Sequence, residues 1–419
     1  MNICCDHCGA LHWVEEATAK SRDNSPRFGM CCNHGQVRLP DTEDPPHALQ
    51  QLLSGDTPQT REFRENICQD NAALAFTSLG VAIDDRINDG RGPYVFRIHG
   101  ELCHHVGSLL PVEGRSPAYA QLYIYDPRAA LEQQMQCNTN LRRDTMELLQ
   151  SMLEQNHFYS GVFKHAYEIL ERHGDIQDIA INLCVDHSRD RRRYNLPTVD
   201  ELAVILPGDG QRMDGRDIIL RMRDGPLMRI HDRHPAYAPL HYVLLFPRGE
   251  DGWSWDLKLH QPDRNQPKRI SQTRFYAYRI QHHPNFFPTI LRGGRLFQQY
   301  LVDMWASSDQ NRLNYFIMNQ NQIRASLYSG LEDAVAAADD GNIDLNELGQ
   351  RIILPSSYIG GPRNMQQRFQ DSMAVARYYK KVDLFITMTA NPHWREIQKL
   401  YYLARQRKIN LTWLPVSSR

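Results

Sequence analysis

Three features are missing from this sequence, and each absence excludes a class of protein. No stretch approaches the roughly 18 consecutive apolar residues of a membrane-spanning helix, so we expect no membrane partner. The first residues, MNICCDHCGA, lack the basic and apolar regions of a secretory signal, which predicts a protein that stays inside the cell. The pattern G-x-x-x-x-G-K-[ST] occurs nowhere, so we expect no ATP site of that type in this chain.

An excess of charge of either sign is also missing. The 48 Lys and Arg residues nearly balance the 49 Asp and Glu residues, which gives a net charge of −1. No global field therefore attracts a polyanion, and any binding of nucleic acid has to come from local basic patches. Hydrophobic residues make up 41% of the 419 residues, which is enough for two or three domains with sizeable cores.

The cysteines are unevenly distributed, because five of the nine lie within the first 32 residues. These five are Cys4, Cys5, Cys8, Cys31 and Cys32. Cys5-x2-Cys8 and Cys31-x2-His34 have the spacing of a zinc knuckle, in which two turns bring four ligands onto one ion. We predict a structural zinc site at Cys5, Cys8, Cys31 and His34, with Cys4 and Cys32 as adjacent alternative ligands. The other interpretation is a set of reduced free thiols.

The order of apolar patterns and turn signals predicts an α+β fold, with a small N-terminal zinc knuckle followed by a mixed α/β body. The predicted segments are a knuckle (1–40), a linker with one short helix (41–62) and an α+β segment (63–260). Within the body we expect a helix over 63–80, a strand over 121–127, a helical run over 128–172, a hairpin around Asp224-Gly225, and a strand over 241–247.

Arginine-rich stretches are the candidates for contact with nucleic acid. Arg292 and Arg295 lie beside two glycines at the start of a predicted helix that carries Phe297, Tyr300 and Trp305. Arginines beside free backbone amides suit phosphate contacts, and nearby aromatic rings can stack bases. The predicted single-stranded DNA contacts are Arg292, Arg295, Arg324 and Arg363, with stacking by Tyr300 or Tyr328. An amphipathic helix whose aromatic residues belong to the core is an equally good interpretation.

A second cluster of potential ligands lies at residues 99–105. Alternation along a strand points His99, Glu101 and Cys103 to one face, and His104 and His105 come next. Ordinary core and surface histidines are the favoured interpretation. The alternative is a metal-dependent nuclease that uses His99, Glu101 and His104 together with Asp383.

Several long stretches resemble the Helitron helicase-like N-terminal domain. They are ISQTRFYAYRI (270–280), PTILRGGRLFQQYLVDMWASSDQNRLN (288–314), RIILPSSYIGGPRNMQQRFQDSMA (351–374) and DLFITMTANPHWREI (383–397). CDHCGALHWVEE (5–16), LPTVDELAVILPGDG (196–210) and HPAYAPLHYVLLFPRGEDGW (234–253) resemble the segment that precedes this domain in Helitron proteins. The resemblance places the Helitron helicase-like domain at 265–397 and leaves 398–419 as an aberrant tail.

The resemblance implies a rolling-circle transposase, in which an HUH-type endonuclease precedes a superfamily 1 helicase. The family's first motif is a strand that ends in T-C-N-P, and the matching residues here are Phe385, Thr387, Thr389, Asn391 and Pro392. Ala390 replaces the cysteine, so this chain is expected to end in the first strand of an incomplete HUH domain. The second motif, His-x-His, is absent from the sequence. Tyr378-x-x-Lys381 spells the tyrosine motif but precedes the first motif, so it is interpreted as the end of a helix.

These observations together predict a truncated Helitron protein that binds DNA without nuclease or helicase activity of its own. Its expected partners are single-stranded DNA and the full-length Helitron transposase, and its expected location is the nucleus. The alternatives are the metal-dependent nuclease described above and a product without function.

Overall fold

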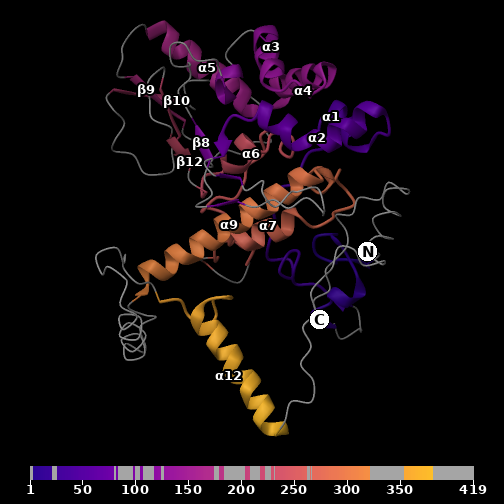
Figure 1. The fold of residues 1–419 in the computed structure, drawn as a ribbon, viewed down its shortest axis with the longest axis vertical. Coiled ribbons are helices and arrows are strands. Elements are labelled where there is room, and N and C mark those ends of the chain that lie inside the picture. Colours follow the sequence, from indigo (N-terminus) through magenta and orange to yellow (C-terminus); the bar gives the residue numbers. More distant parts are fainter. Residues whose placement is uncertain are drawn as a thin grey trace. The chain divides into compact units, whose positions relative to one another are not determined.

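The computed structural model describes residues 3–20, 26–79, 82–83, 98–99, 104–106, 118–123, 127–173, 179–183, 203–207, 218–221, 228–230, 232–261, 265, 267–320 and 353–380. The chain divides into two compact units: the first contains the described residues up to Trp305, and the second contains those from Ala306 onward. Helices are mixed with short strands, as the α+β prediction requires (Figure 1). Across these ranges, no helix is long and apolar enough to cross a membrane.

The N-terminal knuckle consists of two short antiparallel ladders, β1 with β2 and β3 with β4. Its elements are β1 (Ile3–Cys4), β2 (Leu11–His12), the 3-10 helix η1 (Val14–Glu16), β3 (Ala19–Lys20) and β4 (Pro26–Arg27). The knuckle has no separate core. Its buried residues Ala10, Phe28 and Val37 belong to one hydrophobic cluster with residues of the helices that follow.

Helices α1 (His47–Ser54) and α2 (Pro58–Leu74) follow the knuckle directly. The short helix expected in residues 41–62 is therefore present, and it buries Leu49, Leu52 and Leu53. The helix expected over 63–80 is α2, which begins and ends earlier than predicted. It begins earlier because the Thr57 hydroxyl caps it by accepting a hydrogen bond from the backbone N–H of Thr60 at 3.2 Å, and because Pro58 occupies the first turn.

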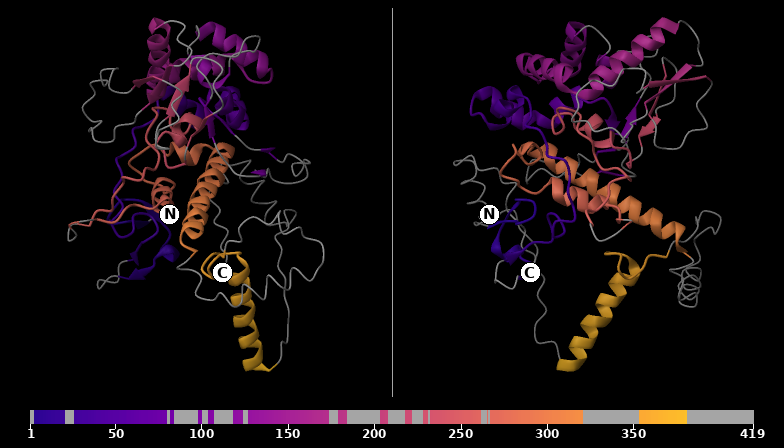
Figure 2. Two further views of the ribbon diagram at one scale, coloured as in Figure 1. Left: turned by 90° about the vertical axis from the view of Figure 1, so that its left-hand side faces the viewer. Right: turned by 180° about the vertical axis from the view of Figure 1, so that it is seen from behind.

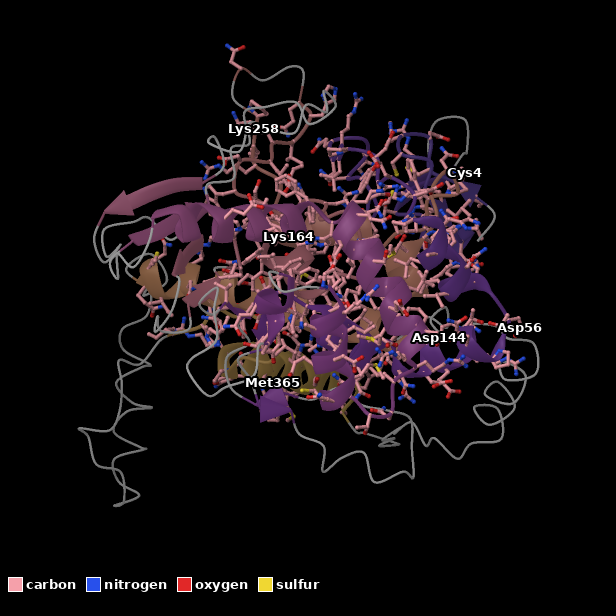
Figure 3. The ribbon with its side chains drawn as sticks, turned by 90° about the horizontal axis from the view of Figure 1, so that it is seen from above. Cys4, Asp56, Asp144, Lys164, Lys258 and Met365 are labelled. Atoms are coloured by element: carbon pink, nitrogen blue, oxygen red, sulfur yellow. The ribbon has the colours of Figure 1, made fainter. Side chains whose placement is uncertain are left out.

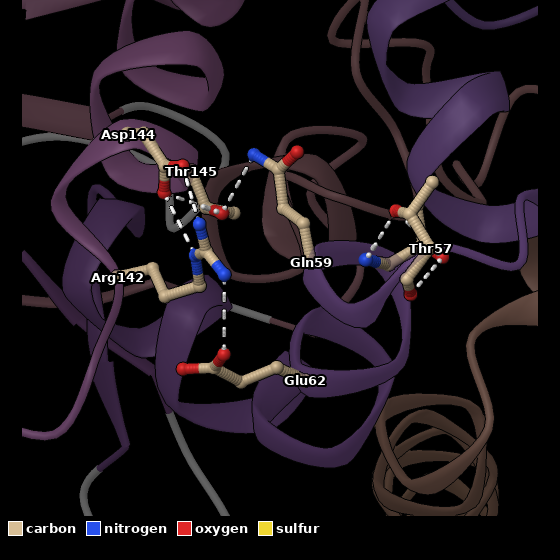
Figure 4. Close-up of polar contacts among 7 residues, drawn as sticks. Thr57, Gln59, Glu62, Arg142, Asp144 and Thr145 are labelled. Atoms are coloured by element: carbon tan, nitrogen blue, oxygen red, sulfur yellow. Dashed lines mark hydrogen bonds and ion pairs between the residues drawn. The ribbon is translucent and has the colours of Figure 1, made fainter.

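Three helices occupy the region where one long helical run was expected. They are α3 (Pro127–Cys137), α4 (Arg143–Asn156) and α5 (Phe158–His173). Polar contacts fix α4 against α2: Gln59 donates to the Thr145 hydroxyl at 3.1 Å, and Arg142 lies 3.7 Å from the Glu62 carboxylate (Figure 4). The strand expected over 121–127 is wrong. Residues Tyr119–Tyr123 form the 3-10 helix η3, in which the Tyr123 hydroxyl donates to the Leu74 carbonyl at 2.5 Å.

The strands form small antiparallel sheets. One has the order β12-β8-β5, a second has the order β10-β9-β11, and β6 pairs with β7. Their bounds are β5 (Ser78–Leu79), β6 (Ala82–Ile83), β7 (Ile98–His99), β8 (His104–Val106), β9 (Ile179–Leu183), β10 (Ala203–Pro207), β11 (Ile218–Arg221) and β12 (Met228–Ile230). The hairpin expected around Asp224-Gly225 is wrong, because β11 pairs with β9 whereas β12 pairs with β8.

The apolar stretch 241–247 is buried but is not a strand. It follows the short helix α6 (Tyr237–His241), and Tyr242, Val243 and Leu244 are at most 1% exposed. Asn71 of α2 supplies the hydrogen bonds that a neighbouring strand would give. Its amide donates to the His241 carbonyl at 2.8 Å and accepts from the Leu244 N–H at 3.2 Å. Side-chain pairing of this kind leaves no periodic signal in the sequence, so the apolar run alone is misleading.

The C-terminal part of the first unit is helical and includes the helix expected after Arg292 and Arg295. It contains α7 (Gln272–Arg279), α8 (Thr289–Arg292) and the beginning of the long helix α9 (Arg295–Met318), which is drawn in orange in Figure 2. The core residues of α9 are Leu296, Phe297, Tyr300 and Met304.

The second unit contains the end of α9 and helix α12 (Pro362–Tyr379). Residues 353–358 pack on α9 and on the residues just after it: Tyr358 donates to Asp309 of α9 at 2.7 Å, and Gln320 accepts from the Ile353 N–H at 2.9 Å. Tyr378 lies in the last turn of α12, as the sequence predicts. The five residues matched to the first Helitron motif lie outside the described residues, so the predicted strand of an HUH domain stays a prediction.

Candidate metal centre and nucleic-acid interface

Four cysteine sulfurs gather at one point of the knuckle. The Sγ atoms of Cys5, Cys8, Cys31 and Cys32 all lie within 4.8 Å of one another. Cys32 Sγ is 3.8 Å from both Cys5 Sγ and Cys31 Sγ. Sulfurs about 2.3 Å from a tetrahedral zinc are roughly 3.8 Å apart, whereas a disulfide would bring them to about 2 Å. The spacing therefore fits four ligands of one zinc ion and does not fit disulfides.

Two turns hold these sulfurs in place. In the first turn, the Cys5 N–H donates to the Ala10 carbonyl at 2.8 Å, and the Gly9 N–H donates to the Cys5 carbonyl at 2.9 Å. Gly9 has a φ of +72°, a left-handed conformation that only glycine adopts without strain. In the second turn, the Gly35 N–H donates to Cys32 Sγ at 3.1 Å, with a Gly35 φ of +81°. Such N–H donation to sulfur favours the thiolate form that binds metal.

Cys32 replaces His34 as the fourth member of the group. Three predicted ligands, Cys5, Cys8 and Cys31, come together. The fourth sulfur is that of Cys32, which the sequence predicts as an alternative ligand. The His34 backbone is left-handed, with a φ of +55°, and its Nε2 lies beside Gly29. Cys4, the other alternative, is exposed and stays outside the group. Spacing could not identify Cys32, because the neighbouring cysteines Cys31 and Cys32 both fit a turn.

Burial and mutual hydrogen bonding set the state of these thiols. Cys5, Cys31 and Cys32 are buried, and Cys8 is half-buried. Hydrogen bonds from Cys31 and then from Cys32 lower the pKa of the Cys5 thiol far below its usual range. The hydrogen bond from Cys31 likewise lowers the pKa of Cys32. Hydrogen bonds with Cys32 and Cys5 raise the pKa of Cys31, so the pKa directions favour a thiolate at Cys5 and at Cys32. Buried thiolates need a cation to balance their charge, and a structural zinc site supplies one.

The candidate metal centre is attached to the part of the chain around α7. The Leu11 N–H donates to the His282 carbonyl at 2.8 Å, and the Gln281 amide donates back to the Leu11 carbonyl at 3.1 Å. On the other side of the knuckle, the His260 N–H donates to the Gln36 carbonyl at 2.7 Å. The knuckle is therefore part of the first unit, and the hydrogen bonds that attach it come from residues distant in the sequence.

Arg292 ends α8 and Arg295 begins α9, and the positive charge of Arg64 lies near Arg292. Arg292 donates to the Ser54 hydroxyl at 3.4 Å, and its guanidinium lies 5.2 Å from the Phe287 ring centroid. Arg64 of α2 donates to the Gly55 carbonyl at 2.7 Å. Burial lowers the pKa of Arg64, and the neighbouring positive charges of Arg61 and Arg292 lower it further. We call Arg61, Arg64, Arg292 and Arg295 the arginine cluster.

The other predicted DNA contacts have different outcomes. Tyr300 is 0% exposed and Phe297 is also buried, so neither ring can stack a base, and the interpretation of these two as core residues is correct. Trp305 is 66% exposed. Arg363 lies half-buried in the first turn of α12. Arg324 and Tyr328 lie outside the described residues.

His104 belongs to a closed hydrogen-bond network. Its Nε2 lies 2.7 Å from Asp303 Oδ2, and the hydroxyls of Tyr237 and Tyr242 each donate to the same carboxylate at 2.8 Å. Burial alone would raise the pKa of Asp303, but the attraction of His104 and the hydrogen bonds from His104 and Tyr237 lower it. His104 and Asp303 are both 0% exposed, so this pair holds β8 and α9 together and meets no substrate. Of the other groups of the predicted nuclease site, His99 lies in β7, whereas Glu101 and Asp383 lie outside the described residues.

The comparison with known families bears on the C-terminal third of the chain. Residues 275–418 match the family described as the Helitron helicase-like domain at the N-terminus. The predicted resemblance is thereby confirmed, and this part of the chain is a Helitron helicase-like domain. The match continues past Ile397, so it includes residues that were expected to form an aberrant tail. A comparison with curated proteins finds no match.

Proposed function

We propose that this chain is a zinc-stabilised module of a Helitron transposition protein that binds single-stranded DNA and does not cut it. The observation that carries the proposal is the attachment of a four-cysteine group to the chain next to the Helitron helicase-like domain. Leu11 and Gln36 of the knuckle are hydrogen-bonded to residues 282 and 260. A knuckle attached in this way stabilises the domain that follows it.

Zinc is the metal that the donor set favours. Four thiolates in tetrahedral array are a closed structural site, which leaves no position for a catalytic water. The 3.8 Å edges between sulfurs support this assignment. The proposed role of the ion is therefore to fix the two turns of the knuckle and the surface that contacts α7.

The arginine cluster supports the binding of a polyanion. Arg295 is exposed at the start of α9, next to the half-buried Arg292, and the pKa of Arg64 is lowered partly by neighbouring positive charge. A phosphate placed among these side chains relieves that repulsion and releases counterions. We therefore propose single-stranded DNA as the partner and the nucleus as the location, as the Helitron resemblance implies.

The experiment is a titration of a labelled oligodeoxythymidylate at several salt concentrations. We expect micromolar affinity and little sequence preference, because phosphates carry no sequence information. The double variant Arg292→Ala with Arg295→Ala should weaken binding to all sequences alike and flatten the logarithmic salt slope by about 0.7 for each phosphate that these arginines neutralise. Unchanged affinity and slope in the double variant would show that the arginine cluster is an ordinary solvated surface.

The control for that experiment is Arg143→Gln. Arg143 is also exposed, and it is paired with Glu132 in a different part of the first unit. This variant should bind DNA as the parent does. A decrease in affinity equal to that of the double variant would show that removing any positive charge weakens binding.

A further inference from the structure

Trp255 is an exposed aromatic residue that belongs to neither the metal centre nor the arginine cluster. Its side chain is 41% exposed. The guanidinium carbons of Arg233 and Arg269 lie 5.1 and 4.9 Å from the centroid of its ring. This surface site therefore combines an aromatic ring that can stack a base with the positive charge of two guanidinium groups.

The residues around Trp255 hold it in place. The neighbouring Trp253 is buried, donates from Nε1 to the Ile270 carbonyl at 2.9 Å, and meets the Trp255 ring edge-on at a centroid distance of 5.8 Å. The strand-like segments on either side of residues 260–267 are joined as well. The Leu259 N–H donates to the Lys268 carbonyl at 2.7 Å, and the Ile270 N–H donates to the Leu257 carbonyl at 2.8 Å. The ring therefore projects from a fixed support.

Positive charge collects on the solvent side of this support. Lys258 and Arg269 are direct partners across the two segments, so their side chains share one face, and both are exposed. Leu259 and Ile270, the adjacent residues on each segment, are buried. Figure 3 shows Lys258 at the periphery of the ribbon. The carboxylates next to this face in sequence are Asp232 and Asp256, and the three cations Arg233, Lys258 and Arg269 outnumber them.

We propose that Arg233, Trp255, Lys258 and Arg269 form a second contact for single-stranded nucleic acid, here called the Trp255 patch. The proposal rests on the proposed binding of single-stranded DNA and adds a residue that stacks an unpaired base. An indole ring at the surface binds a stacked base more strongly than it binds a guanidinium group. A base therefore displaces one arginine from the ring, and the released guanidinium is within reach of the adjoining phosphates. The patch lies outside residues 275–418, which match the Helitron family.

The test compares Trp255→Ala with the parent protein on a labelled oligodeoxythymidylate and on an abasic oligonucleotide of equal length. We expect about a tenfold loss of affinity for the thymidylate, with an unchanged salt slope, because stacking involves no counterion. The abasic strand, which has nothing to stack, should bind both proteins equally. Trp255→Phe should recover most of the affinity, because it keeps an aromatic face.

Tyr315→Ala is the control, because Tyr315 is also an exposed aromatic residue and its ring is not among those with a described arginine contact. It should bind thymidylate as the parent does. Arg269→Gln should flatten the salt slope by about 0.7, as expected for one phosphate contact. Parent-like affinity of Trp255→Ala would overturn the Trp255 patch and leave the proposed function intact. Failure of the parent to bind any single strand would overturn both.

Discussion

Asp303 and His104 are 199 positions apart in the sequence, yet His104 Nε2 lies 2.7 Å from Asp303 Oδ2 in the centre of the first unit. Two tyrosine hydroxyls donate to the same carboxylate, so every neighbour of Asp303 in this network is a donor. The network joins β8, the region of α6 and the long helix α9. Parts of the chain that precede the Helitron match therefore share a polar centre with the domain itself.

Replacing Asp303 tests this network. Asp303→Asn keeps the shape of the side chain, but its NH2 group then faces groups that also donate hydrogen bonds. Some of these buried donors therefore lose their acceptor. We expect a loss of about 3–5 kcal/mol in the free energy of unfolding, measured by urea denaturation. Asp309→Asn is the control on the same helix, because Asp309 also accepts from a tyrosine, Tyr358, at a partly exposed site. The control should cost under about 1 kcal/mol, and equal losses would argue against a special role for Asp303.

The choice between Cys32 and His34 is tested by metal content. Purified parent protein, kept reduced and free of chelator, should contain about one equivalent of zinc. Cys32→Ser should lose most of the zinc and should unfold at a lower temperature, whereas His34→Ala should keep the metal. Cys4→Ser is the control for a cysteine outside the group. Zinc that survives Cys32→Ser and is lost in His34→Ala would restore the ligand set predicted from spacing.

Asp70 gives the protein a predictable dependence on pH. It is 2% exposed, and burial raises the pKa of its carboxyl to about 7. An unfolded Asp titrates near 3.9, so the folded chain holds the proton more tightly, and the stability this gives is complete below about pH 4 and lost as the pH rises through 7. Asp70→Asn, which is always neutral, should therefore stabilise the fold by up to about 3–4 kcal/mol at pH 8.

The measurement is urea denaturation of the parent and Asp70→Asn at pH 5 and at pH 8. The gain should be clearly smaller at pH 5, because more of the Asp70 side chain is protonated there in the folded protein. The exposed Asp256, changed to Asn, should shift the free energy of unfolding by less than about 0.5 kcal/mol at either pH. A gain that does not change with pH would show that Asp70 is not the titrating group.

Catalysis by Tyr378 is expected to be absent. The tyrosine is 80% exposed in the last turn of α12, and the sequence contains no His-x-His pair to hold a metal beside it. Single-stranded DNA incubated with the protein and magnesium or manganese should be neither cut nor covalently attached, as judged by denaturing gels. A covalent adduct that disappears in Tyr378→Phe would contradict the proposed function and point to a nuclease.

The sequence predicts best those features that depend on short-range patterns. The Cys5-x2-Cys8 pair and the helix that ends near Tyr378 both follow from local spacing or periodicity. Residues 241–247 could not be predicted, because their burial comes from Asn71 and from helices distant in the sequence. The Trp255 patch has no signal in the sequence for the same reason: Arg233 and Trp255 approach each other only in the folded chain.

The attachment of the knuckle also has a consequence for the order of events during synthesis. The Gln281 amide that holds the Leu11 carbonyl is made 270 residues later than its partner. At the usual 5–20 residues per second, the ribosome takes roughly 15–50 s to reach it. During that interval the cysteine turns lack the surface that later covers them, so a metal ion bound at that stage would protect the nascent chain from oxidation and mispairing.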